Sequence, residues 1–151
     1  VDQLIEQLTI DEGKVLEKDF LLRLNLIETY LEDAIKIDPE RSKKIEVKLR
    51  ASLEELKIEI DSNRFEQELI FYLEKFDITE EKVRLQNHLD YFKKVLENDF
   101  PNGKKLGFVA QEIGREINTI GSKANHSELQ KIVVQMKDEL EKIKEQLLNV
   151  L

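Results

Sequence analysis

The chain has 151 residues, of which 40% are hydrophobic and 37% charged, and 24 basic against 32 acidic side chains give a formal net charge of −8. The charged fraction exceeds the roughly 25% of an average soluble domain, which fits long helices with large solvated faces. Five glycines and two prolines exclude a collagenous chain, and no apolar run approaches the ~18 residues of a membrane span.

The sequence contains no cysteine, so disulfides, thiolate metal sites and cysteine nucleophiles are excluded together. Any chemistry must use carboxylates, the two histidines, hydroxyls or a bound metal. With no leader or membrane segment in the sequence, we expect a cytoplasmic protein that has no membrane partner. The chain starts at Val1 rather than Met, inside an amphipathic phrase, so we expect it to be part of a longer protein.

Apolar residues recur at helical spacing almost throughout, and no segment alternates like a strand. The pattern predicts an all-α fold in which long antiparallel helices form a bundle. We expect two regions, a helical linker or hairpin at 1–62 and a C-terminal helical domain at 63–151. The first helix is predicted at 14–37. Asp38-Pro39 is predicted to end it and to begin the next, because Asp caps helices and Pro suits their first position.

The second helix carries an apolar stripe made of Ile45, Leu49, Leu53, Leu56 and Ile60. Nothing at 61–63 strongly breaks a helix, so the sequence leaves open whether this helix continues into the apolar run that starts at Phe65. Asp77, with Glu80 three residues later, has the capping-box pattern and predicts a helix at 78–98.

A loop at 99–105 leads into a helix predicted at 106–124, whose faces carry different kinds of residue. The apolar stripe, which must face a core, consists of Leu106, Val109, Ile113, Ile117, Ile120 and Ala124. One flank carries Glu112, Glu116, Thr119 and Lys123, and the back carries Gln111, Arg115, Asn118 and Ser122. A helix with a purely structural role rarely needs this combination of charged, amide and hydroxyl side chains.

Gly107, Gly114 and Gly121 recur every seven residues on the other flank of this helix. Each glycine costs roughly 1 kcal/mol relative to Ala inside a helix. Close approach of a second helix, which we favour, or of a ligand such as a phosphate backbone would explain the three positions.

The last helix has apolar residues that alternate spacings of four and three, which is the seam of a coiled coil. They are Leu129, Val133, Met136, Leu140, Ile143, Leu147 and Val150. The same geometry serves a bundle helix within one chain, and the sequence does not decide between the two. His126 precedes Ser127, a plausible N-cap, and is predicted to be a loop residue. Met136 and the pair Tyr91 and Phe92 are expected to be packing residues.

Two further clusters carry polar chemistry. Glu81, Arg84 and His88 lie at i, i+3 and i+7, and supply the parts of an acid/base or phosphate-handling site. A surface ion pair beside a partly buried histidine is the simpler alternative. Arg64, Glu66, Gln67 and Glu68 form a second dense cluster, which a solvated helix face explains equally well.

The charge distribution allows a local polyanion site. The net charge of −8 argues against a generic nucleic-acid coat. Residues 101–123 nevertheless carry +2, which leaves −10 on the rest of the chain. No zinc motif is present. Carboxylate faces suit Mg²⁺ or Mn²⁺, which Glu112 and Glu116 could hold with His88 or Glu81.

Taken in order, NRFEQEL (63–69), DITEEKVRLQNHL (77–89), KKLGFVAQEIGREINTIGSKA (104–124) and the helical tail resemble the C-terminal region of the YicC-like family of bacterial endoribonucleases. The resemblance covers about 50–151. It implies a bacterial protein that cuts RNA internally with divalent-metal assistance, assembles as a ring-like homo-oligomer, and has an N-terminal half that is absent here.

Residues that match the family pattern carry over one by one. From the first two segments they are Arg64, Glu66, Gln67, Glu68, Glu80, Glu81, Arg84 and His88. From the third they are Gln111, Glu112, Arg115, Glu116, Asn118, Thr119, Ser122 and Lys123. The sequence departs from the pattern at Lys104 and Gly107, where an arginine and an acidic residue are expected, and at His126, where an acidic residue is more usual.

The leading hypothesis is an endoribonuclease that uses Mg²⁺ or Mn²⁺. The catalytic candidates are Glu81, His88, Glu112 and Glu116, and the metal ligands would be Glu112, Glu116 and His88. The RNA-binding candidates are Arg64, Arg84, Lys104, Lys105, Gln111, Arg115, Asn118 and Lys123. A metal-independent route would use the RNA 2′-hydroxyl as nucleophile with His88 as base, and the fragment alone could be inactive.

The rival hypothesis is a helical oligomerisation or RNA-binding scaffold without catalysis of its own. In that case the charged rows form ion pairs between subunits, and the glycines and heptads are packing seams. Convergence of the three polar clusters on one concave surface would favour the enzyme, and dispersed exposed rows would favour the scaffold.

Overall fold

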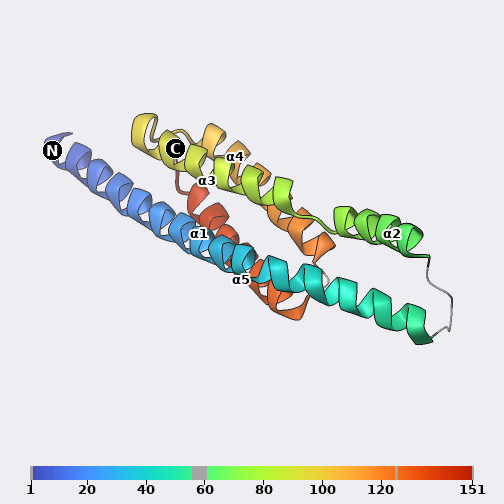
Figure 1. The fold of residues 1–151 in the computed structure, drawn as a ribbon. Helices are drawn as coiled ribbons and strands as arrows, with labels where there is room; N and C mark the ends of the chain where they lie inside the picture. The colour runs from blue at the N-terminus through green and yellow to red at the C-terminus, as the bar shows by residue number, and fades with distance from the viewer. Residues whose placement is uncertain (1, 56–60, 125, 151) are drawn as a thin grey trace.

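The computed structural model describes residues 2–55, 61–124 and 126–150, and these residues form α-helices without any strand. The helices are α1 (Asp2–Glu55), α2 (Ser62–Lys75), α3 (Thr79–Asn98), α4 (Gly103–Lys123) and α5 (Ser127–Leu147) (Figure 1). The predicted all-α fold is confirmed. No helix in the described ranges is long and apolar enough to cross a bilayer.

Four of the helices form a bundle in which each has two principal neighbours. α1 packs against α5 and α3, and α4 packs against α3 and α5, so α4 lies diagonally across the bundle from α1. α2 lies outside this bundle, along the C-terminal half of α1 (Figure 1). The consequence for function is that α4 buries one face and two flanks while its outer face stays open to solvent.

One continuous core joins the four bundle helices. The six residues of the stripe predicted at 106–124 are buried, and so are Leu129, Val133, Met136, Leu140 and Ile143 of α5, whereas Leu147 and Val150 at the end of the predicted seam are only partly buried. The heptads of α5 are therefore used within the chain, against α1 and α4. α1 contributes Phe20, Leu24, Ile27, Leu31 and Ala34. Tyr91, expected to pack, is instead 42% exposed, whereas Phe92 is buried and lies 5.6 Å from Phe20 between ring centroids.

The prediction that Asp38-Pro39 divides two helices is wrong, since α1 runs through Pro39 without a break. Proline inside a helix leaves the carbonyl four residues earlier without its N–H partner. Here Ile35 and Pro39 are both exposed, so water can bond the freed carbonyl. Continuity also gives Arg41 the position of one helical turn after Asp38, and the Arg41 Nε donates to Asp38 Oδ1 at 3.0 Å.

Continuity between the second and third predicted helices is also excluded. The described part of α1 ends at Glu55, and Asp61 caps a new helix by accepting a hydrogen bond from the Asn63 N–H at 3.1 Å. Ile45, Leu49 and Leu53 are only partly buried, while Leu56 and Ile60 lie outside the described residues.

The remaining helix ends differ by a few residues from prediction because side chains outside the apolar stripes bond the free N–H groups. The Asn102 side chain accepts from the Lys105 N–H at 3.1 Å, so α4 starts three residues early. The capping box at α3 is not formed: Asp77 bonds Thr79, whereas Glu80 pairs with Arg84. Ser127 is the first residue of α5, and His126 is its N-cap.

The three glycines of α4 divide into two kinds. A Cβ on Gly114 would lie 3.1 Å from Leu140 Cδ2, and a Cβ on Gly121 would lie 3.1 Å from Val133 Cγ1, so both positions allow α5 to pack closely. A Cβ on Gly107 would meet no atom of the described residues within 4 Å. Helix packing, the explanation favoured from sequence, is confirmed for Gly114 and Gly121 and is wrong for Gly107.

This division predicts an order of stabilities for single alanine substitutions. Gly107→Ala should raise the free energy of unfolding by about 0.5–1 kcal/mol, because it gains helix propensity without a steric cost. Gly121→Ala should gain less or lose stability, because the stiff β-branched Val133 must move. Gly114→Ala should lie between the two, since Leu140 can change rotamer. Urea denaturation tests the order, and equal stabilisation by Gly107→Ala and Gly121→Ala would contradict it.

Candidate functional site

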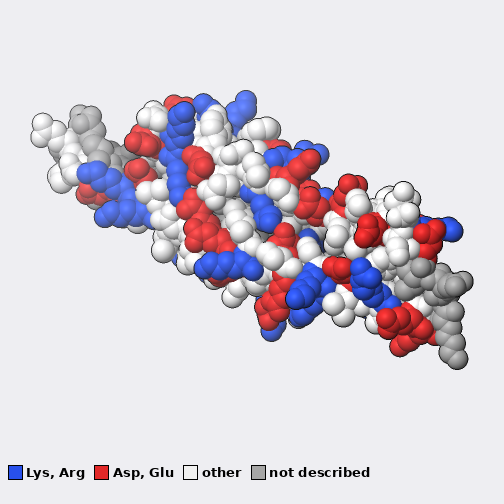
Figure 2. Space-filling model, viewed as in Figure 1, with Lys and Arg blue, Asp and Glu red and all other residues white. Residues whose placement is uncertain are grey.

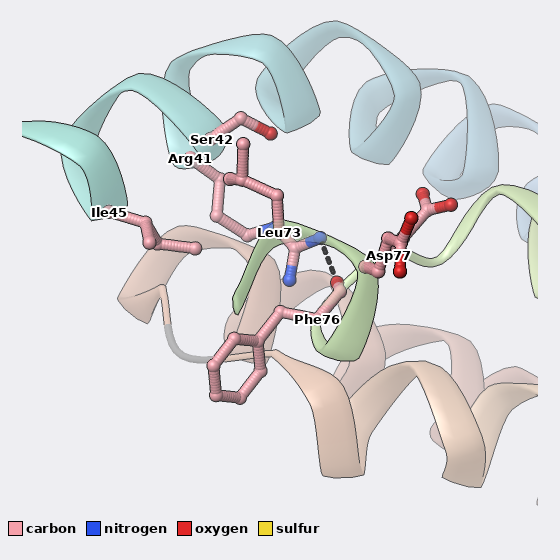
Figure 3. A pocket seen from close by; sticks show the side chains of 7 residues that line it. Arg41, Ser42, Ile45, Leu73, Phe76 and Asp77 are labelled. Carbon is pink, nitrogen blue, oxygen red and sulfur yellow. Dashed lines mark hydrogen bonds between the residues drawn. The ribbon is translucent and has the colours of Figure 1, made fainter. Parts of the chain in front are cut away.

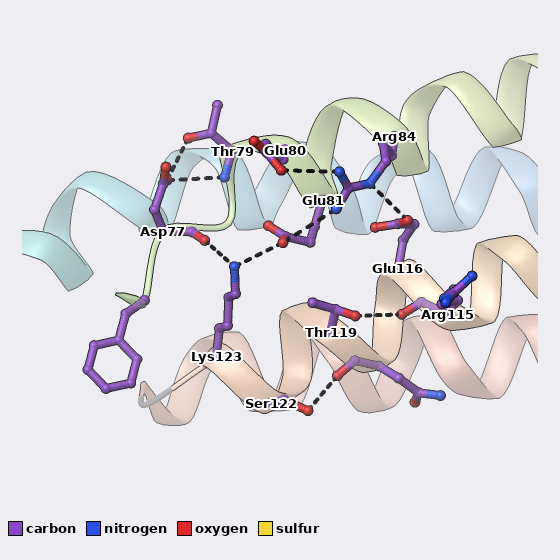
Figure 4. Close-up of polar contacts among 12 residues, drawn as sticks. Asp77, Thr79, Glu80, Glu81, Arg84, Arg115, Glu116, Thr119, Ser122 and Lys123 are labelled. Carbon is purple, nitrogen blue, oxygen red and sulfur yellow. Dashed lines mark hydrogen bonds and ion pairs between the residues drawn. The ribbon is translucent and has the colours of Figure 1, made fainter. Parts of the chain in front are cut away.

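A charged seam runs between α3 and α4, where the flank of α4 that carries Glu116 and Lys123 faces Glu81 and Arg84 (Figure 4). The Arg84 Nε donates to Glu116 Oε1 at 3.0 Å, and Lys123 Nζ donates to Glu81 Oε1 at 2.9 Å. Arg84 Nη2 lies 3.6 Å from Glu81 Oε1, and Arg84 Nη1 donates to Glu80 Oε2 at 3.2 Å. Residues of α3 and α4 that are 32 and 42 positions apart in sequence therefore meet in one network.

The carboxylates of the seam are inside and the cations reach outward. Glu81 and Glu116 are 3% and 6% exposed, whereas the side chains of Arg84 and Lys123 are 46% and 32% exposed. The hydrogen bond to Glu116 is the main cause that raises the pKa of Arg84, with Glu80 second. The arginine therefore stays charged at all working pH values.

Among the described residues, one buried acceptor in the seam has no partner. Glu81 Oε2 is inaccessible to solvent and accepts no hydrogen bond from them, while Glu81 Oε1 accepts one from Lys123 Nζ. Buried polar atoms are nearly always paired, so an orphan marks a strained or functional position. Glu81 is thus the seam carboxylate with an unbonded buried oxygen, although its charge is compensated by Lys123 at 2.9 Å and by Arg84 at 3.6 Å.

The α2–α3 linker completes the seam at one end (Figure 4). Lys123 Nζ also donates to the Asp77 carbonyl oxygen at 3.0 Å. The Asp77 carboxylate accepts from the Thr79 hydroxyl at 2.6 Å and from the Thr79 N–H at 3.1 Å. The hydroxyl bond is the largest cause that lowers the pKa of Asp77, and nearby Lys82 and Lys123 act in the same direction.

The other predicted residues lie beside the seam or on the outer face of α4. His88 is half-buried on α3, one turn after Arg84, and Glu112 is partly buried, 4.0 Å from Arg115. The back row of α4, namely Gln111, Arg115, Asn118 and Ser122, is exposed, as are Lys104 and Lys105. Thr119 and Ser122 donate to carbonyls four residues earlier, which uses their hydroxyls within the helix (Figure 4).

The cluster of Arg64, Glu66, Gln67 and Glu68 is exposed on α2, outside the bundle. α2 is fastened to α1 by Phe65, over whose ring the Arg50 guanidinium lies at 4.4 Å. The structure therefore brings together the second and third predicted clusters and leaves the first one apart.

No three His, Asp or Glu side chains gather to hold a metal within the described ranges. Glu116 and Glu81 are paired with cations instead. The ligand set Glu112, Glu116 and His88 stays a prediction.

Arg41 is the residue that sequence reasoning missed (Figure 3). It is 3% exposed, and its guanidinium donates to Asp38 Oδ1, to the Lys123 carbonyl at 3.1 Å, and to the Phe76 carbonyl. It lines a pocket between α1 and the end of α2 with Ser42, Ile45, Leu73, Glu74, Phe76 and Asp77. One guanidinium thus joins α1, the α2–α3 linker and the end of α4.

A sequence signal for Arg41 does exist. The buried positions of α1 alternate spacings of four and three at Phe20, Leu24, Ile27, Leu31 and Ala34, and the next two positions are 38 and 41. Asp38 and Arg41 therefore occupy core positions of the same seam. A charged pair at two successive core positions indicates buried polar contacts.

A helical bundle with buried carboxylates beneath solvent-reaching cations is the class of domain that the fold and the seam define. A family model described as "Endoribonuclease YicC-like, C-terminal" matches residues 34–151. "Probable endoribonuclease YicC" of Clostridioides difficile is 36% identical over 149 residues, which are 97% of this chain and 51% of that protein. The protein of the same name from Haemophilus influenzae is 33% identical over 103 residues, 68% of this chain and 36% of that protein.

The chain belongs to the YicC-like endoribonuclease family and corresponds to its C-terminal domain. The resemblance seen in the sequence is confirmed. The chain spans about half the length of the first relative and about a third of the second.

The Asp77–Thr79 contact predicts a pH dependence. Thr79→Ala should return the pKa of Asp77 toward its ordinary value of 3.8, because the main hydrogen bond is lost. A lowered pKa in the folded state means that the ionised form stabilises the fold. This stabilisation is present above about pH 4 and is lost as the pH falls through the lowered pKa. The variant should be less stable than wild type at pH 6, with the difference shrinking toward pH 3.

Carboxyl NMR titration of Asp77 and urea denaturation at both pH values test this prediction. Thr79→Ser, which keeps the hydroxyl, is the matched control and should behave as wild type. A pKa of Asp77 that is the same in Thr79→Ala and Thr79→Ser would refute the assigned cause.

The contacts of Arg41 predict a large loss of stability on its removal. Arg41→Met should lower the free energy of unfolding by about 2–4 kcal/mol, because two carbonyls and a carboxylate lose a buried donor. Lys43→Met, an exposed cation two residues on, should change it by less than about 0.5 kcal/mol. Chemical denaturation gives both values, and similar effects of the two substitutions would count against the buried network.

Proposed function

We propose that this chain is the helical C-terminal part of an endoribonuclease, and that the charged seam between α3 and α4 takes part in cleaving RNA phosphodiester bonds. The observation that carries the proposal is the pairing of buried Glu81 and Glu116 with the solvent-reaching cations Lys123 and Arg84. The family description and the names of both relatives support RNA as the substrate. Because the relatives are longer, we assign cleavage to the whole protein, to which this chain contributes the seam.

The cations would hold the scissile phosphate. A lysine has three N–H donors and an arginine five. Lys123 bonds two acceptors within the chain and Arg84 contacts three carboxylates. Donors therefore remain for phosphate oxygens, and their positive charge would stabilise the negative charge that develops on the phosphorus centre.

A group that moves protons lies next to these cations. His88, half-buried one turn after Arg84, is the candidate general base, and Glu81 is the alternative. In the route through the 2′-hydroxyl, His88 takes that proton and the freed oxygen attacks phosphorus. The bond between phosphorus and the 5′-oxygen then breaks, and the 5′-oxygen takes a proton from water. The products then carry a 2′,3′-cyclic phosphate and a 5′-hydroxyl.

Hydrolysis by water is the second route, and it includes the predicted metal. Bound Mg²⁺ or Mn²⁺ would neutralise phosphate charge and acidify the attacking water. Its proposed ligands are Glu112, Glu116 and His88. Cleavage of a labelled structured RNA, with Mn²⁺ or with EDTA, separates the routes, since the hydrolytic one requires the ion and leaves no cyclic phosphate. Both the 151-residue chain and the complete gene product should be assayed.

A non-catalytic RNA-binding or assembly scaffold is the second candidate function. Two observations favour it: the seam carboxylates are already neutralised by cations, and the cluster on α2 lies apart. In that case RNA is bound and stays intact in every arm of the cleavage assay.

Substitutions in the seam should separate these functions. Glu116→Gln and His88→Ala should each lower cleavage by about 100-fold or more while helical content is unchanged, because each removes a group assigned to the chemical step. Wild-type turnover in both variants would exclude the proposed site.

Glu139→Gln is the matched control for Glu116→Gln. Glu139 lies on α5, is 7% exposed, and accepts from Arg23 at 3.1 Å, so it repeats the burial and the arginine contact of Glu116 away from the seam. It should leave cleavage unchanged. An equal loss in both Gln variants would show that buried ion pairs act only through stability.

A further inference from the structure

The outer face of α4 carries one straight row of exposed side chains, which we name the outer ridge. It extends the predicted back row toward the start of the helix. Its members follow spacings of four and three, and are Lys104, Phe108, Gln111, Arg115, Asn118 and Ser122. By the 100° helical rotation the ridge lies opposite the buried stripe of α4. α3 and α5 cover the flanks of α4, so the ridge is the part of α4 left to a partner.

The ridge has a charge that contrasts with the rest of the protein. It contains two cations, two amides and a hydroxyl, and no carboxylate, in a chain of net charge −8. On the face shown in Figure 2, by contrast, basic and acidic side chains are interspersed. The nearest acidic neighbour known for Arg115 is Glu112, at 4.0 Å, so this pair is long and the 76% exposed guanidinium remains accessible. The charge of the ridge is complementary to a polyanion.

Phe108 is the unexpected member of the ridge. It is 64% exposed, whereas the core rings Phe20 and Phe92 are fully buried. Its neighbour Gly107 has open space where a Cβ would stand. Across from the start of α4, Tyr91 on α3 is 42% exposed, and Lys105 Nζ lies 6.0 Å from its ring centroid. An aromatic ring with free faces between cations is the arrangement on which proteins stack unpaired bases.

We propose that the outer ridge of α4 binds a single-stranded segment of RNA, with a base stacked on Phe108 and phosphates held by Lys104 and Arg115. The inference rests on the proposed function for the nature of the polyanion. Lys104 and Arg115 are about 16 Å apart along the helix at ~1.5 Å per residue.

Single strands fit this ridge better than duplexes. In an A-form duplex the base faces are stacked inside and only edges and backbone are presented. The ring of Phe108 could then stack on no base of a duplex. The ridge also runs beside the flank of α4 that carries Glu116, so a strand lying on it would pass next to the charged seam.

The absence of tryptophan from the sequence gives a direct test. Phe108→Trp introduces one fluorophore at the proposed stacking position. Titration with an unstructured RNA of about ten nucleotides, in EDTA, should quench its fluorescence, and the matching duplex should not. Phe108→Leu keeps an apolar side chain without a ring, and should weaken single-strand binding by roughly 5- to 150-fold. Arg115→Gln should weaken binding and reduce its salt dependence by about one phosphate contact.

Phe71→Ala is the matched control, because Phe71 is 63% exposed on α2 and so resembles Phe108 in type and exposure. It should bind the single strand as wild type does. Wild-type affinity in Phe108→Leu, or equal quenching by single strand and duplex, would overturn the inference. A change of sedimentation coefficient in Phe108→Leu without RNA would also overturn it, because the ridge would then contact a second copy of the chain.

These outcomes are distinct from failure of the proposed function. If the single strand quenches the fluorescence but no assay shows cleavage, the ridge proposal is supported and the nuclease proposal is refuted. If Phe108→Leu still cleaves RNA and binds the single strand with wild-type affinity, the ridge proposal is refuted and the nuclease proposal is supported.

Discussion

The buried guanidinium of Arg41 is the contact on which the arrangement of the candidate site depends. It reaches from the C-terminal half of α1 to the last carbonyl of α4, that of Lys123, and to the carbonyl of Phe76, the C-cap of α2. Asp38 neutralises it and is itself held by Lys82 at 2.9 Å, which adds α3 to the same junction. Since the carbonyl bonded by Arg41 belongs to Lys123, the junction fixes the backbone from which Lys123 reaches Glu81 and Asp77. A charge buried in α1 therefore positions a cation on α4.

The charge balance of the seam constrains how it can meet a phosphate. Glu81 and Glu116 are compensated by Lys123 and Arg84, so the four groups together are neutral. A neutral cluster attracts a polyanion weakly from a distance, because long-range attraction follows net charge. A phosphate gains there from directed hydrogen bonds once it has arrived. Attraction has to come from cations that have no buried carboxylate partner among the described residues, and Lys104 and Arg115 on the outer ridge are such cations.

The spacing of apolar residues correctly predicted which faces of the helices are buried. It failed where a single tertiary contact decides whether a helix ends or continues. The buried stripes of α4 and α5 follow from spacing alone, because each helix needs one apolar face. The helix boundary predicted at Pro39 was wrong because the sequence around a proline in the first turn of a helix can look the same as that around an exposed proline inside a long helix. The place of Pro39 in α1 is supported by Arg41, whose partners lie 35 and 82 residues away. The separation of the α2 cluster from the seam is likewise a tertiary property. The pairing of Arg84 with Glu116 depends on how α3 and α4 pack together.

Each face of α4, the helix whose sequence first indicated function, has a different structural role. The apolar stripe of α4 builds the core, Gly114 and Gly121 admit α5, Glu116 and Lys123 complete the seam with α3, and the outer ridge remains. Gly107 continues the glycine spacing, but none of the helices that the structure describes packs within 4 Å of a Cβ at this position. A glycine that helix packing does not require, one residue before an exposed aromatic ring, leaves backbone accessible beside that ring. Packing therefore explains two of the three glycines, and under the proposal made for the outer ridge the third leaves room for a bound strand.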